Sequence, residues 1–154
     1  MEQTDVYIDF ERSLGPWIGR TSKMVDYYIQ EALENHGLDL TKEQMVVLKK
    51  VNDQDGLNQN ELAFLTYRDK SSLARLLAKM EKKGYLYRQQ NRDDKRINEV
   101  FLTPMGRDIF QECKVVIKDI IQTMENNIDE SEIQQMIRIL KKVQQNFAGG
   151  LPEK

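Results

Sequence analysis

Apolar residues recur every three or four positions along four long stretches of the chain, which is the spacing of one buried helix face. The pattern predicts long helices at residues 10–36, 42–52, 104–124 and 130–147. Gly15-Pro16 indicates either a break in the first helix or a late start for it. Gly37 is the expected stop of this helix.

Capping signals mark where three of these helices begin. Thr41–Gln44 and Asp129–Glu132 both have the capping-box spacing, in which the side chains at the two ends satisfy free backbone amides reciprocally. Thr103 and Pro104 combine an N-cap hydroxyl with a proline at the first helical position. The long helices are therefore defined at their starts as well as along their apolar faces.

Shorter elements occupy the middle of the chain. Asn58–Glu61 is a capping signature ahead of a short helix from Glu61 to about Tyr67. Asp69 is a suitable N-cap for a helix over residues 70–83, which Gly84 should end.

Two stretches rich in strand-forming residues follow, 85–88 and 100–103, at the separation of a hairpin. The order of helix, short helix, helix and hairpin is that of a winged helix-turn-helix. We expect a mainly α (α+β) fold in which this module carries a two-stranded wing and is flanked by long terminal helices.

We expect a single domain over residues 1–154, with a winged helix-turn-helix lobe at 41–103 and a helical dimerisation lobe at 6–36 plus 104–148. The long amphipathic helices present more apolar surface than so small a middle module can cover. A second copy of the chain is the usual cover, so the pattern predicts a homodimer.

Composition excludes several classes of protein. One cysteine and one histidine, far apart in the 154 residues, cannot form a disulfide framework and make a zinc site or a hydrolytic triad improbable. No catalytic constellation is present, so we expect neither an enzyme nor a cofactor. The acidic start lacks a secretory pattern and no apolar run is long enough to span a bilayer, so we expect a cytoplasmic protein without a membrane partner.

Charge is distributed unevenly although the net charge is only −2. Residues 68–96 contain ten basic and four acidic side chains, whereas the rest of the chain has 13 basic and 21 acidic ones. A basic module in an acidic body is the pattern expected of a surface that binds a polyanion.

The predicted helix at 70–83 has a small, basic face opposite its apolar stripe. In a helix-turn-helix the start of this helix enters the major groove of DNA. Its candidate DNA-binding residues are Lys70, Ser71, Ser72, Arg75 and Lys79. The hydroxyls suit phosphate oxygens and the guanidinium suits guanine, although such a face is also ordinary for solvent-exposed helices.

A run of mixed charge, QNRDDKRI at residues 90–97, lies between the two predicted strands. Charge alone makes it a solvated turn. Its position makes it the tip of a wing, where Arg92 and Lys95 can reach the phosphate backbone.

The sequence resembles the MarR family of bacterial transcriptional regulators at several of these places. The matching stretches, in order, are Asn60–Ala63, Asp69–Arg75, Glu81–Arg88, Asp94–Arg96 and Leu102–Gly106. The resemblance implies that Arg96 enters the minor groove and that Asp94 orients it. Two residues depart from the family pattern, because Tyr85 replaces an aliphatic residue and Glu99 places an acid on the outgoing strand.

The resemblance also implies a homodimer on a pseudopalindromic operator in double-stranded DNA. Many relatives are repressors that a small aromatic or anionic effector releases. Trp17, Met24 and Tyr28 are candidates for lining an effector cleft, and core packing is the alternative. Cys113 is a candidate redox sensor, and a buried structural thiol is the alternative. A winged-helix module for protein interaction or non-specific nucleic-acid binding remains an alternative function.

Overall fold

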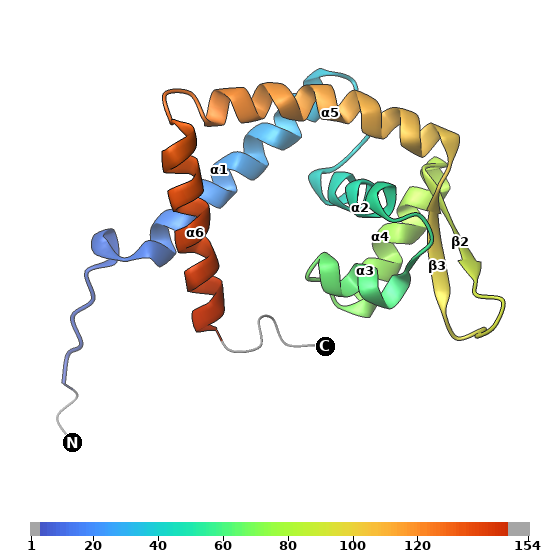
Figure 1. The fold of residues 1–154 in the computed structure, drawn as a ribbon, viewed down its shortest axis with the longest axis horizontal. Coiled ribbons are helices and arrows are strands. Elements are labelled where there is room, and N and C mark those ends of the chain that lie inside the picture. The colour runs from blue at the N-terminus through green and yellow to red at the C-terminus, as the bar shows by residue number, and fades with distance from the viewer. Residues whose placement is uncertain (1–3, 148–154) are drawn as a thin grey trace.

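The computed structural model describes residues 4–147, so the outer ends of the predicted 1–154 domain lie outside the described residues. The chain forms a short 3-10 turn, six helices and three strands over this range (Figure 1). Their bounds are η1 Phe10–Arg12, α1 Leu14–Asn35, α2 Lys42–Asp53, β1 Leu57–Asn58, α3 Gln59–Leu65, α4 Lys70–Lys83, β2 Leu86–Gln90, β3 Asn98–Leu102, α5 Pro104–Met124 and α6 Glu130–Asn146. The mainly α fold with a small sheet is the predicted class, and α5 connects the sheet to α6 across the length of the molecule.

The predicted helix starts are confirmed by their hydrogen bonds. Both capping boxes form, at Thr41 with Gln44 and at Asp129 with Glu132. The Thr103 hydroxyl accepts the Gly106 amide at 3.0 Å. The first helix begins at Leu14, which resolves the predicted choice between a break and a late start in favour of the late start.

The sheet contains one strand more than the two-stranded wing that the sequence predicts. Its order is β1-β3-β2 and all pairs are antiparallel. Leu57 of β1 and Arg88 of β2 both pair with Val100 of β3. β1 has only two residues, so it has no alternation along the chain that could predict it.

The core lies between α2, α3, α4 and the sheet, and the neighbouring parts of α1 and α5 close it. Its fully buried side chains include Leu33, Leu48, Leu62, Leu73, Leu77, Met80, Val100 and Cys113. Gly106, in the first turn of α5, lies directly against the backbone carbonyl of Tyr85. This close approach joins the start of α5 to the base of the wing.

The terminal helices differ from the rest because much of their apolar surface is uncovered. α6 has no buried residue, and Met136 on its apolar stripe is 57% exposed. On α1 the side chains of Leu14, Trp17, Met24 and Tyr28 are also exposed. None of the helices within residues 4–147 combines the length and the hydropathy that crossing a bilayer requires.

Candidate nucleic-acid interface

Helix α4 presents the predicted face to solvent. Its carboxylate cap forms as expected, because Asp69 accepts the Ser72 amide at 2.7 Å. Leu73, Leu77 and Met80 hold the opposite face in the core. The predicted contact residues Lys70, Ser71, Arg75 and Lys79 are exposed, and Ser72 is half-buried. The start of α4 therefore offers backbone amides, hydroxyls and cationic side chains together.

Arg68 also belongs to this surface, although in the sequence it contributes only to the local basic charge. Its Nη1 donates to the Ser72 hydroxyl oxygen at 2.8 Å. Since that oxygen already accepts a hydrogen bond, the Ser72 hydroxyl proton is available for an acceptor outside the helix. The four-residue spacing between Arg68 and Ser72 could have predicted this contact. Arg68 lies before the start of α4, however, so the helical pattern of that helix does not include it.

The wing tip is an ordered turn built on Asn91. Its side-chain oxygen accepts the backbone amides of Asp93 at 2.8 Å and Asp94 at 3.0 Å. Its side-chain amide donates to Glu99 on β3. Glu99, which departs from the family pattern, is therefore engaged in holding the tip rather than directed away from it.

Asp94 and Arg96 form a bidentate pair at the end of this turn. Arg96 Nε lies 3.0 Å from Asp94 Oδ1 and Arg96 Nη2 lies 3.1 Å from Oδ2. The Arg96 backbone amide also donates to Oδ1, at 3.0 Å. The hydrogen bond from the Arg96 side chain lowers the pKa of Asp94, with a further contribution from this amide. The carboxylate is thus held charged beside a guanidinium that is 90% exposed.

An ion pair joins the base of the wing, formed by β2 and β3, to α4. Arg88 of β2 forms an ion pair with Glu81 of α4. A second ion pair, between Arg107 of α5 and Asp55 at 2.7 Å, joins α5 to the connection between α2 and β1. The Arg88–Glu81 pair ties the wing to α4, and the exposed Arg92 and Lys95 extend from the wing tip.

The predicted effector residues lie on one exposed face of α1. Trp17 Nε1 donates to the Glu11 carbonyl at 2.8 Å, and the Arg20 guanidinium lies 4.5 Å from the centre of the indole ring. Trp17, Met24 and Tyr28 are not packed into the core of the described chain. A hollow of about 560 Å³ elsewhere, near the start of α4, is lined by Lys42, Glu43, Val46, Leu65, Thr66, Tyr67, Arg68, Asp69 and Ser72, and includes none of them.

Cys113 and His36 have structural settings. Cys113 is 1% exposed on the core side of α5, and burial raises its pKa to about 11. This setting favours the structural interpretation over the redox sensor. His36 is the C-cap of α1, as its position near a helix end suggests, and its Nδ1 lies 2.8 Å from the Ala32 carbonyl oxygen.

We expect Cys113 to react with iodoacetamide far more slowly in the folded protein than in urea. With a pKa of about 11, roughly one thiol in 10⁴ is a thiolate at neutral pH, and the side chain is also enclosed. Mass spectrometry of samples quenched over time measures the rate. Equal rates with and without urea would contradict the structural assignment and return Cys113 to the redox candidates.

Comparisons with known proteins agree with this geometry. The model of the MarR family matches residues 40–97. The chain is 32% identical over 130 residues to the HTH-type transcriptional regulator SarZ of Staphylococcus epidermidis, covering 82% of this chain and 84% of that protein. It is 28% identical over 105 residues to the transcriptional regulator HosA of Escherichia coli, covering 68% and 78%.

The same fold occurs in a crystal structure of a mutant MarR from E. coli complexed with operator DNA. The similarity has a TM-score of 0.75 and 29% sequence identity, and covers 88% of this chain and 99% of that one. The fold, the matched winged-helix segment and the identity to SarZ over most of both chains lead to one conclusion. The chain belongs to the MarR family of transcriptional regulators.

Proposed function

We propose that the protein is a homodimeric, sequence-specific DNA-binding regulator that represses transcription until a small effector releases it. The observation that carries the proposal is the Asp94–Arg96 pair, which presents a fully charged guanidinium on an ordered wing tip. The similar MarR from E. coli was crystallised with operator DNA, which supports the same kind of partner here.

Two elements, α4 and the wing, contact DNA in this proposal. The first turn of α4 enters the major groove, where Ser71 and Ser72 bond phosphate oxygens and Arg75 reads a base edge. The wing reaches the neighbouring minor groove, whose concentrated negative potential attracts Arg96. Arg92 and Lys95 bond the backbone on either side of the pair.

The terminal helices supply the dimer contact in this proposal. Residues 6–36 and 104–148, the last of which lies outside the described residues, form the proposed dimerisation lobe, whereas 41–103 form the DNA-reading lobe. The exposed apolar faces of α1 and α6 support it, because a monomer would leave both in water. Two-fold symmetry would set the recognition helices roughly 34–36 Å apart, matching a pseudopalindromic operator.

Release by an effector requires a ligand that prefers the conformation unable to fit DNA. The exposed α1 face of Trp17, Met24 and Tyr28 remains our candidate for contacting an aromatic or anionic ligand, with the partner subunit as the expected cover. We expect the protein to work in the cytoplasm, because its proposed DNA target is located there.

Binding to the promoter of its own gene tests the proposal. Fluorescence anisotropy should show tighter binding to that fragment than to a scrambled duplex of equal length. The affinity should fall by about 10³-fold or more between roughly 50 and 200 mM salt, because Lys and Arg release counterions from phosphates. A flat salt dependence would exclude a phosphate-driven complex, and equal affinity for both duplexes would favour the non-specific alternative.

The dimer contact is tested by placing a charge on the exposed stripe of α6. Met136→Glu should weaken the dimer by about 3 kcal/mol, because the carboxylate would be buried without a partner. Sedimentation velocity should then show monomer where the wild type shows dimer. Gln135→Glu, which adds the same charge to an exposed position off the stripe, is the control and should remain dimeric. A dimeric Met136→Glu protein would exclude this face.

A further inference from the structure

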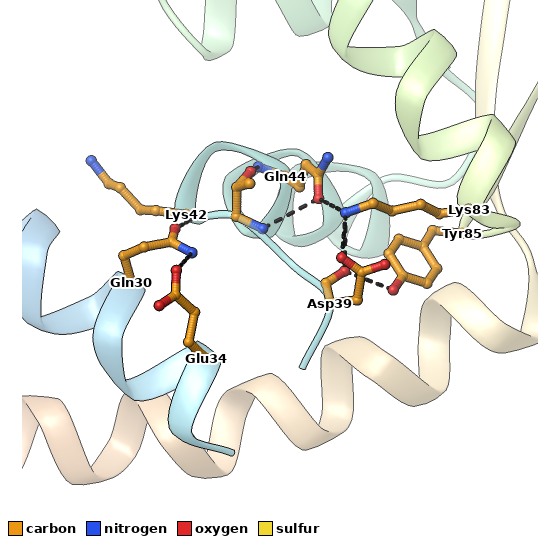
Figure 2. Close-up of polar contacts among 8 residues, drawn as sticks. Gln30, Glu34, Asp39, Lys42, Gln44, Lys83 and Tyr85 are labelled. Atoms are coloured by element: carbon orange, nitrogen blue, oxygen red, sulfur yellow. Dashed lines mark hydrogen bonds and ion pairs between the residues drawn. The ribbon is translucent and has the colours of Figure 1, made fainter. Parts of the chain in front are cut away.

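The last residue of α4, the proposed recognition helix, is the centre of a polar junction. Lys83 Nζ donates to the Asp39 carbonyl oxygen at 3.2 Å and to Gln44 Oε1 at 3.0 Å, and pairs with Asp39 Oδ1 at 3.0 Å (Figure 2). An ammonium group has three protons, and three oxygens of this junction surround it. We call Asp39, Gln44, Lys83 and Tyr85 the Lys83 junction.

The partners of Lys83 come from a different part of the chain. Asp39 lies in the connection between α1 and α2, and Gln44 lies in the first turn of α2. Gln44 is only 2% exposed, and the same side-chain oxygen that meets Lys83 accepts the Thr41 amide at 3.2 Å. Removing the ammonium would therefore leave a largely buried oxygen with one partner fewer.

Tyr85 strengthens the junction from the other side of Gly84. Its hydroxyl donates to the Asp39 carbonyl at 2.7 Å, so that one oxygen receives bonds from residues on both sides of the helix end. Burial, followed by the nearby Asp39 charge, raises the pKa of Tyr85, which keeps the hydroxyl a donor. Tyr85, which departs from the family pattern, thus makes a hydrogen bond that an aliphatic residue at this position could not make.

The hydrogen bonds continue from the start of α2 into α1. Gln30 Oε1 accepts the Lys42 amide at 3.2 Å, and Lys42 Nζ pairs with Asp26 at 2.7 Å. Figure 2 shows Gln30 and Lys42 beside the junction, on the α1 side of the α2 start. Polar contacts therefore connect α1, the start of α2 and the end of α4.

We propose that Lys83 is a positioning residue for DNA reading, which fixes the angle of α4 relative to α1 through Asp39 and Gln44. This inference rests on the proposed function. α4 has 14 residues and is about 21 Å long, so a tilt of roughly 3° at its Lys83 end moves its first turn by about 1 Å. Base contacts need closer placement than this, whereas contacts of flexible side chains with phosphates do not.

The test is Lys83→Met, which keeps most of the apolar side chain and removes the ammonium. We expect operator affinity to fall roughly tenfold, with the affinity for scrambled duplex and the salt dependence lowered little. Lys83→Arg should recover part of the loss. Lys118→Met, which removes a charge from the exposed side of α5, should bind the operator as wild type does.

Two further variants separate positioning from folding. Tyr85→Phe removes a single hydroxyl and should lower operator affinity by a few-fold without lowering the folded fraction. Gln44→Met should lower operator affinity much less in the Lys83→Met protein than in the wild type, because both substitutions remove the same Lys83–Gln44 contact. Full additivity in this double-mutant cycle would overturn the proposed route.

Amide hydrogen exchange of the free protein tests the Lys83 junction without relying on DNA binding. Lys83→Met should increase exchange at the α1–α2 connection and the last turn of α4. Unchanged exchange there would overturn the junction even if DNA binding were absent. Wild-type protein that binds no operator would end the proposed function, and Lys83→Met that loses scrambled-duplex affinity equally would make Lys83 a phosphate contact.

Discussion

Replacing Arg96 with alanine should lower operator affinity by about 1–3 kcal/mol, roughly 5- to 150-fold, the largest loss expected from any single wing residue. Asp94 holds the guanidinium in the free protein by two side-chain hydrogen bonds. Little side-chain entropy then remains to be lost on binding. Anisotropy titrations with the operator and a scrambled duplex at one salt concentration measure the loss.

Variants of other residues at the same wing tip distinguish insertion of Arg96 into the minor groove from a general attraction of positive charge to DNA. Arg92→Ala removes an exposed cation that lacks the Asp94 pairing, so it should mainly reduce the salt slope by about 0.9. Asp94→Asn should weaken operator binding although it removes a negative charge, because Arg96 loses its orientation. If Asp94→Asn bound the operator more tightly and Arg96→Ala behaved like Arg92→Ala, the minor-groove assignment would be wrong.

Gly106→Ala should destabilise the protein by roughly 3 kcal/mol, a large effect for one methyl group. A Cβ at this position would lie 1.9 Å from the Tyr85 carbonyl oxygen. That carbonyl belongs to the backbone and accepts the Thr103 amide at 3.1 Å, so it cannot move without loosening the end of the hairpin. Urea unfolding followed by circular dichroism, at one fixed protein concentration, measures the change.

Gly19→Ala is the matched control for this substitution. Gly19 is also helical, but nothing lies within 4 Å of an added Cβ. Alanine there should stabilise α1 by about 0.5–1 kcal/mol, since glycine loses more backbone freedom on folding. Similar unfolding midpoints for the two variants would show that α5 can move away from Tyr85 at little cost.

Local signals in the sequence were sufficient for most of the fold. The caps at Thr41, Asp69, Thr103 and Asp129 each bond the residue three positions later, so their geometry follows from nearby sequence. β1 was missed because only its pairing with β3, more than forty residues later, makes Leu57–Asn58 a strand. Non-local pairing leaves no period in so short a segment.

In the candidate site, too, contacts between residues close in sequence could be predicted and contacts between distant residues could not. The Asp94–Arg96 contact spans two residues, and the resemblance to the MarR family implied it before the structure showed it. Lys83 counted only toward the basic charge in the sequence, because its partners Asp39 and Gln44 are 44 and 39 residues away. In the proposed dimer the surroundings of Trp17, Met24 and Tyr28 would depend on a second chain, which periodicity along one chain does not describe.

In the proposed dimeric repressor, the uncovered stripe of α6 would link the amount of protein to the degree of repression. If α6 is buried only when two chains meet, dimers form in proportion to the square of the monomer concentration in dilute solution. Occupancy of a two-fold operator would then rise more steeply than the amount of protein, so halving its synthesis would relieve repression by more than half. The apolar face of one terminal helix would thereby set a concentration threshold for the genes under control.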